Sequence, residues 1–203
     1  MIFNNIKVQN EGYVYCKSNF YSAQDVLIGD LNYTFSTGIN RLSGEIDSGI
    51  WAISYLLSMY TYRPKDFILF GEPNVIINNE SFDLSVLSKH SCYMDKLYPL
   101  FSSNATVKKI VLRGLNYSKL DYSPNDVKDL FHIDNNHFEQ SLACAGNETF
   151  KAMAAIGYCY NKEIFCFPWL SNKRFKSYHE NLSILLETLE SLKKVVIIPI
   201  GEK

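Results

Sequence analysis

Residues 44–51 have the glycine spacing of a phosphate-binding loop but lack the side chains that such a loop uses. The working motif is Gly-x-x-x-x-Gly-Lys-Ser/Thr, in which backbone N–H groups surround phosphates, the lysine contacts them and the hydroxyl holds Mg²⁺. Gly44 and Gly49 keep that spacing, whereas Ile50 replaces the lysine and Trp51 replaces the hydroxyl. The sequence therefore retains the glycine frame and loses the groups that would hold phosphate and metal.

The interior of this loop is acidic, which disfavours phosphate further. Glu45, Ile46, Asp47 and Ser48 separate the two glycines. Like charges about 4 Å apart repel by roughly 1 to 4 kcal/mol, depending on solvation. We expect no tight binding of ATP, and we hypothesise that Asp47 or Ser48 fills the ring of N–H groups and stabilises the empty loop. The alternatives are two solvated acids, or a loop that still attracts ATP weakly through its N–H groups and the helix N-terminus.

The first half of the chain reads as β-structure around one buried helix. Residues 2–35 carry β-type segments with a turn at residues 9–11, and residues 39–42 form a short strand that leads into the loop. Residues 50–60 are apolar on nearly all sides, which predicts a helix in the middle of the structure, covered on both flanks. Further short strands are predicted at residues 67–70, 75–77 and 91–94.

The second half reads as helices followed by a β-α-β unit. Ser123 and Pro124 form an N-cap and a first helical position. Helices are predicted at residues 107–115, 123–132, 135–143 and 148–160. A strand at residues 164–167, an amphipathic helix at 173–192 and a strand at 195–198 follow. Apolar strands bounded by helices imply a parallel sheet that is covered on both faces.

This series of segments resembles the ATPase domain of the ATP-binding cassette (ABC) family over essentially the whole chain. Residues 44–52 fall at the family's Walker A loop, and Asp95 stands where the Q-loop has Gln. Residues 164–167 look like the Walker B strand, and residues 195–198 look like the strand that ends in the switch His. The family's Ser-Gly-Gly-Gln signature is replaced by Cys144, Ala145, Gly146 and Asn147, which head an alanine-rich helix.

The resemblance implies an α/β fold of the P-loop NTPase type. Its parts would be an N-terminal antiparallel β region, a parallel core sheet flanked by helices, and a helical subdomain. It implies one domain over residues 1–203, with a core of residues 1–95 and 161–203 and a helical subdomain over about 96–160. The loop is then a phosphate loop by ancestry that has become a structural turn, and Ile50 and Trp51 are predicted to be core residues.

The departures from the family pattern all remove catalytic groups. Pro168 and Trp169 stand where the Walker B strand should be followed by the Mg²⁺-orienting acid and the water-polarising Glu, and residues 164–178 contain no Asp or Glu. The switch-His position is Ile200 or Gly201. Phosphoryl transfer depends on positioning and on neutralising oxygen charge with Lys and Mg²⁺. We therefore expect no catalytic residue, no metal site and no cofactor, with Mg²⁺ and ATP both disfavoured.

The function implied is that of a catalytically inactive ABC subunit, an accessory or pairing partner in a transport system. It would form a homodimer, or a heterodimer with another ABC ATPase, and dock on a membrane permease through the region from Asp95 to Val107. In the family, the signature helix of one subunit points its N-terminus at the phosphates held by the other, so residues 144–147 would contact the partner. A plain helix cap by Asn147 is the alternative.

Two further functional hypotheses stay open. One is a stand-alone scaffold or interaction protein that keeps the fold for its surfaces. The other is an enzyme with relocated residues, which the sequence does not support because its isolated acids show no paired arrangement: Glu72, Asp95, Asp121 and Glu148.

Composition and charge exclude several other classes. The formal net charge of −1 gives no reason to propose nucleic acid as a partner. No apolar run approaches the roughly 20 residues that cross a bilayer, and the N-terminus lacks the pattern of a signal peptide. We expect a cytoplasmic protein, held at the inner face of the membrane only through a partner. The five cysteines have no ligand spacing with the histidines, and three lie in apolar stretches where a thiol packs as a small hydrophobe.

Overall fold

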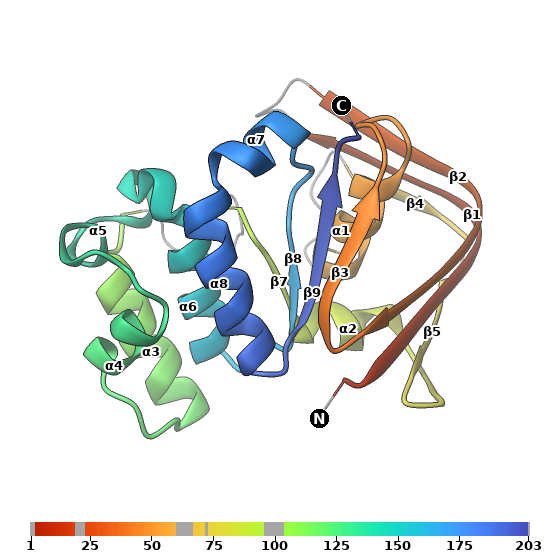
Figure 1. Cartoon of the computed structure of the whole chain (residues 1–203). Coiled ribbons are helices and arrows are strands. Elements are labelled where there is room, and N and C mark those ends of the chain that lie inside the picture. Colours follow the sequence, from red (N-terminus) through yellow and green to blue (C-terminus); the bar gives the residue numbers. More distant parts are fainter. Residues whose placement is uncertain (1–2, 19–22, 60–66, 72, 96–103, 203) are drawn as a thin grey trace.

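The computed structural model describes residues 3–18, 23–59, 67–71, 73–95 and 104–202. The described elements form two β-sheets with helices between and beside them (Figure 1). Helix α1 (Ile50–Met59) contacts both sheets, and α6 (Thr149–Cys159) and α8 (His179–Ser191) pack against the parallel sheet on its other face. This layering confirms the predicted α/β fold. No helix in the described part of the chain has the length and apolar character needed to cross a membrane.

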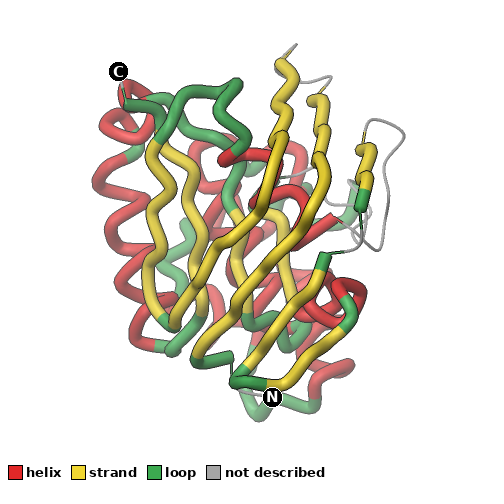
Figure 2. The backbone as a smooth tube through the Cα atoms, turned by 90° about the vertical axis from the view of Figure 1, so that its right-hand side faces the viewer, coloured by secondary structure: helices red, strands yellow, loops and turns green. Residues whose placement is uncertain are grey.

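The outer sheet is antiparallel, as predicted, and its largest part is a long hairpin. Strand β1 (Asn5–Ser18) pairs along its whole length with β2 (Ala23–Ser36). The other edge of β1 pairs with two shorter strands, β4 (Phe67–Phe70) and β5 (Asn74–Ile77), and β5 continues to β6 (Glu80–Phe82). Figure 2 shows these strands running side by side across one face of the molecule.

The turn predicted at residues 9–11 is wrong, because β1 runs through it without a break. Gln9 lies opposite Asn32 of β2 on one side and opposite Asn74 of β5 on the other. The neighbouring strands therefore satisfy the backbone of this polar stretch, and its turn-like composition does not decide the conformation.

The inner sheet is parallel throughout, which confirms the second sheet prediction. Its order is β3 (Gly38–Ser43), β9 (Val195–Ile200), β8 (Ile164–Cys166) and β7 (Ser91–Tyr93). Because the strands are parallel, their carboxyl ends lie along one edge, which we call the carboxyl edge. In open α/β sheets this edge is where ligands bind, and the 44–51 loop leaves it directly after β3.

Helix α1 is buried on all sides, as its apolar composition predicts. Ile50 and Trp51 are 6% and 1% exposed, which confirms their assignment to the core. The two serines in the helix are buried as well, and both have partners: Ser54 Oγ donates to the Phe167 carbonyl, and Ser58 Oγ donates to the Ser54 carbonyl at 2.8 Å. A helix between two sheets can keep hydroxyls only when they are bonded in this way.

The predicted helical stretch after residue 104 is confirmed, with different boundaries. Its elements are α3 (Val107–Ser118), α4 (Pro124–Leu130), α5 (Asn135–Glu139), η1 (Leu142–Cys144), η2 (Gly146–Glu148) and α6. Ser123 caps α4 as predicted, and Asp126 completes a capping box with it. The helix predicted over residues 135–143 ends at Glu139, because the backbone of Gln140 and Leu142 bonds to the start of α3 instead.

Two other boundaries differ from the prediction. The short helix α2 (Leu84–His90) was not expected; Asp83 caps it, and the burial of Leu84 and Leu87 stabilises a helix too short to form alone. The single helix predicted over residues 173–192 is two, α7 (Asn172–Ser177) and α8, because Tyr178 leaves helical geometry between them. The Tyr178 ring packs edge-on against Phe150 of α6, with ring centroids 6.1 Å apart.

Candidate functional site

The 44–51 loop is closed by bonds within itself and to β9. The Gly44 N–H donates to the Ile200 carbonyl at 3.0 Å, which continues the pairing of β3 with β9 into the loop. The Ser48 hydroxyl donates to the Glu45 carbonyl at 2.6 Å, so this side chain folds back over the loop. A Cβ atom at Gly44 would lie 2.5 Å from Ser48 Oγ, so only glycine leaves room for that arrangement. Gly49, at φ 88°, then turns the chain into α1.

Trp51, in the first turn of α1, belongs to an aromatic cluster. Trp51 Nε1 donates to Tyr93 Oη at 2.8 Å across the carboxyl edge. The Tyr55 ring stands edge-on to both, with centroids 5.2 Å from Tyr93 and 6.4 Å from Trp51. Tyr93 is 4% exposed and ends β7. We call Trp51, Tyr55 and Tyr93 the aromatic cluster; its one buried indole N–H is satisfied by the chain's own phenol.

The segment after β8 closes over the same loop. Trp169 Nε1 donates to the Gly44 carbonyl at 3.1 Å, and Leu170 bridges to Ile200 of β9. A Cβ atom at Gly201 would lie 2.8 Å from the Trp169 ring, so the indole rests against the end of β9. The structure thus brings together three segments that the sequence singled out, those at residues 44–51, 168–169 and 200–201, and joins them by hydrogen bonds and packing.

The two acidic side chains of the loop, Glu45 and Asp47, differ in their exposure to solvent. Asp47 is exposed to solvent, whereas Glu45 is half-buried. One carboxylate oxygen of Glu45 is buried with no hydrogen-bond partner among the described residues. A polyphosphate bound at this loop would be repelled by both carboxylates, and the loop itself contains no lysine to balance the charge.

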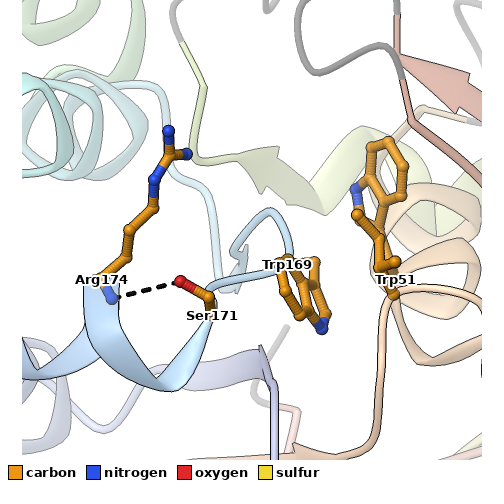
Figure 3. Close-up of a pocket in the computed structure, with 5 residues that line it drawn as sticks. Trp51, Trp169, Ser171 and Arg174 are labelled. Carbon is orange, nitrogen blue, oxygen red and sulfur yellow. Dashed lines mark hydrogen bonds between the residues drawn. The ribbon is translucent and has the colours of Figure 1, made fainter. Parts of the chain in front are cut away.

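A cavity of about 220 Å³ opens beside the loop at the carboxyl edge (Figure 3). Its lining residues are Ile46, Trp51, Trp169, Ser171 and Arg174. Sequence reasoning missed Ser171, Arg174 and the cluster residue Tyr93 as parts of the site. The available signal was the two tryptophans, since Trp51 and Trp169 are the only ones in the chain.

The Q-loop-like Asp95 also lies near this edge. It follows β7 and is 9% exposed, and the N–H of the preceding Met94 donates to the Cys166 carbonyl at 2.8 Å. The predicted docking region from Asp95 to Val107 is described only at its two ends, since residues 96–103 lie outside the described part of the chain.

The signature-like residues lie on the helical side of the parallel sheet, between α5 and α6 (Figure 1). Cys144 is exposed and Ala145 is buried, and Gly146 has φ 54°. The N-cap residue of α6 is Glu148, so the alternative that Asn147 caps this helix is wrong. The side chain of Asn147 lies outside what the structure describes. Phe150, one turn further on, contacts Phe167 at a centroid distance of 5.2 Å and so connects this segment to the end of β8.

The buried thiols confirm the expectation drawn from their apolar neighbours. Cys92, Cys159 and Cys166 are buried in the core. Desolvation raises the pKa of Cys92 and of Cys159 to about 12, and burial raises the pKa of Cys166 as well. These thiols stay protonated at neutral pH and act as core residues. No group of His, Cys, Asp and Glu in the described residues could hold a metal ion.

Solved ABC structures share this fold. An ABC transporter ATP-binding protein assigned in Pyrococcus furiosus aligns with a TM-score of 0.61 at 15% identity, covering 97% of this chain and 92% of that one. A dimeric ATP-binding cassette in a post-hydrolysis state with ADP and Pi gives 0.61 at 11% identity, covering 97% and 88%. A bacterial Atm1-family ABC exporter with ATP bound gives 0.58 at 14% identity, covering all of this chain and 35% of the exporter.

The chain therefore has the fold of the ATP-binding domains of ABC transporters. Identities this low establish the fold alone, because one fold hosts many activities. No protein-family model and no curated protein matches the sequence.

Proposed function

We propose that this chain is a catalytically inactive ABC-type subunit, which pairs with an active ABC ATPase or with a second copy of itself in a transport system. The observation that carries the proposal is the aromatic cluster. Trp51 follows the loop where the family has its Mg²⁺-binding hydroxyl, and it is buried and bonded to Tyr93. A metal ion needs oxygen ligands at that position, but the Trp51 indole offers none, and the Tyr93 phenol beside it already accepts from Trp51 Nε1.

The same proposal includes the loss of tight ATP binding. Ser48 turns its hydroxyl onto the loop's own backbone, and a buried oxygen of Glu45 faces no cation among the described residues. Trp169 stands where the family has its catalytic Glu, and it bonds to the loop at Gly44. Every one of these features favours the empty loop over a loop that holds phosphate.

Pairing and membrane docking are supported by the kind of protein that shares the fold. One of the similar structures is a dimeric cassette, and another is an ABC exporter. We propose that residues 144–147 contact the paired ATPase and that the region beginning at Asp95 contacts a permease. The chain would act as one domain, whose helical part over about residues 96–160 carries both contacts.

Affinity purification of the tagged chain from cross-linked membranes of its native host tests this function. We expect an ABC ATPase and a multi-span permease to be recovered together with it. A Cys144→Glu variant, which places charge on the proposed contact, should recover about tenfold less ATPase. The matched control is Ser81→Glu on the exposed strand β6, which should leave recovery unchanged. Recovery of neither an ATPase nor a permease with the unaltered chain would contradict the proposal.

A stand-alone scaffold is the second candidate, and one observation favours it. Large apolar side chains are exposed on and after α3, where Leu112 is 46%, Tyr117 73% and Tyr122 43% exposed. Such side chains are enriched at protein contacts. If the purified chain recovers only soluble proteins, and Tyr117→Glu abolishes that recovery, the scaffold function replaces the transport function.

A further inference from the structure

The cavity at the carboxyl edge is built around both tryptophans of the chain. Figure 3 shows the Trp51 and Trp169 rings standing apart, and Arg174 reaching up from α7 on the far side of Trp169. Ile46 and Ser171 complete the lining. The two rings come from α1 and from the segment after β8, which the loop and the parallel sheet hold in place.

The indole rings offer the cavity carbon surface and no free donor. Trp51 Nε1 donates to Tyr93 Oη at 2.8 Å, and Trp169 Nε1 donates to the Gly44 carbonyl at 3.1 Å. Ile46 adds aliphatic surface. Walls of this kind favour a flat apolar group, because aromatic rings pack well offset or edge-on against indoles.

One end of the cavity is polar and basic. Among the described residues that line it, only Arg174 is charged. The Ser171 hydroxyl accepts from the Arg174 backbone N–H at 3.2 Å, which leaves its own proton to donate to a ligand. A guanidinium group recognises a carboxylate through paired, charge-assisted hydrogen bonds. Ile46 lies between Glu45 and Asp47 in the chain, so these carboxylates would repel a ligand with several negative charges more strongly than a ligand with one.

The volume limits the ligand to about one ring. An engineered cavity of about 150 Å³ takes benzene, whereas pockets for drug-sized ligands begin at about 300 Å³. At about 220 Å³ the present cavity lies between the two. We propose that it is a binding site for a small aromatic monocarboxylate, with the ring packed against the indole surfaces and the acid at Arg174 and Ser171. The site is independent of the pairing proposed above and holds with or without a partner subunit.

Tryptophan fluorescence tests the site directly, because both tryptophans of the chain line the cavity. Phenylacetate is the probe, and phenylacetamide is its uncharged counterpart. We expect phenylacetate to change the emission saturably, with matching heat in isothermal titration, and phenylacetamide to bind about tenfold more weakly. Arg174→Gln should weaken phenylacetate binding by about tenfold. The matched control, Lys176→Gln on the same helix, should leave it unchanged.

A second variant tests the cavity itself. Ile46→Phe fills the space and should abolish binding while far-UV circular dichroism remains that of the unaltered chain. The proposal is overturned if phenylacetate gives no saturable signal, or if phenylacetamide binds as tightly as phenylacetate. It is also overturned if Arg174→Gln and Lys176→Gln weaken phenylacetate binding equally. Should Ile46→Phe not fold, the comparison of the two α7 variants decides alone.

Discussion

At the carboxyl edge of the parallel sheet, Trp51, Tyr55 and Tyr93 pack ring against ring, whereas the start of α6 buries a set of charges. Lys151 Nζ lies 3.1 Å from Glu148 Oε1 and donates to the His132 carbonyl at 3.0 Å. The side chains of Lys151 and Glu148 are only 7% and 13% exposed. This fold therefore buries an ion pair on its helical side while it buries carbon at the edge where a phosphate loop would hold its ligand.

Lys151 and Glu148 keep their charges on the helical side because each has a partner, whereas His137 Nδ1 beside them is buried without a hydrogen-bond partner among the described residues. The second oxygen of Glu148 accepts from the Asp134 N–H at 2.8 Å and lies 3.4 Å from His137 Nδ1. A buried charge is tolerated only when it is paired and bonded in this manner. At the loop, by contrast, a buried oxygen of Glu45 has no partner among the described residues. Aromatic packing thus fills the loop edge, where the helical side has a buried ion pair.

The largest effect should come from restoring the motif residues to the loop. The double variant Ile50→Lys with Trp51→Ser removes two core side chains and buries an ammonium, so we expect a loss of about 5 kcal/mol or more in unfolding free energy. Urea denaturation measures it. Leu112→Ser, at a position 46% exposed, is the control and should change stability by about 0.5 kcal/mol. ATP turnover by the double variant would contradict the account, because the motif residues would then suffice.

The second-largest loss of unfolding free energy should come from breaking the buried ion pair of Lys151 and Glu148. Lys151→Met leaves the Glu148 carboxylate buried without its cation, and removing one partner of a buried pair costs about 3 kcal/mol or more. Lys108→Met is the matched control, because Lys108 and Glu139 form a pair whose side chains are 44% and 59% exposed; exposed pairs contribute about 0 to 1 kcal/mol. Equal losses from the two variants, measured by denaturation, would remove the contrast between the two regions.

Removing the hydrogen bond inside the aromatic cluster should cost less stability. Tyr93→Phe keeps the ring and leaves Trp51 Nε1 buried without an acceptor, which costs about 1 to 3 kcal/mol. Tyr117→Phe, on a ring 73% exposed, should be neutral in the same thermal melt. If Tyr93→Phe is also neutral, the indole N–H has another partner and the cluster is looser than described.

The smallest effect concerns the cap of α4 and depends on pH. The Ser123 N–H and hydroxyl bond to the Asp126 carboxylate and lower its pKa below the ordinary 3.8. A lowered folded-state pKa gives stability that is present above the unfolded value and is lost as pH falls through the folded one. Asp126→Asn should therefore melt lower than the unaltered chain at pH 7 and converge with it in acid. Asp121→Asn, on the loop before α4, is the control, and a difference for Asp126→Asn that persists below pH 2 would contradict this.

Much of the fold could be predicted from the sequence, because its signals are local. The largely apolar stretch at 50–60 predicted a buried helix, observed at Ile50–Met59, and Ser123 with Pro124 predicted a helix start. The polar stretch at 9–11 was misjudged, because its strand is stabilised by neighbours distant in sequence. Tyr178 splits a predicted helix for the same kind of reason, since its ring packs on Phe150.

Of the candidate site, the sequence predicted the loop at residues 44–51 but not the cavity beside it. The glycine spacing and the side chains at positions 50 and 51 predicted a loop that turns into core residues, and Ile50 and Trp51 are buried; that these residues replace a phosphate-binding lysine and a metal-binding hydroxyl stays a prediction. No local pattern pairs Trp51 with Tyr93, or Trp169 with Gly44, because those hydrogen bonds join segments 42 and 125 positions apart. The cavity depends on both pairings, so it emerges only from the folded chain.

The central claim is that the loop no longer holds nucleotide, and calorimetric titration of the purified chain with MgATP tests it most directly. An active ABC ATP-binding domain in the same buffer serves as the positive control. We predict no saturable heat from this chain at ATP concentrations up to about 1 mM, because Ile50 and Trp51 replace the lysine and the hydroxyl that would offset the phosphate charge. Tight, saturable binding of MgATP would contradict the account.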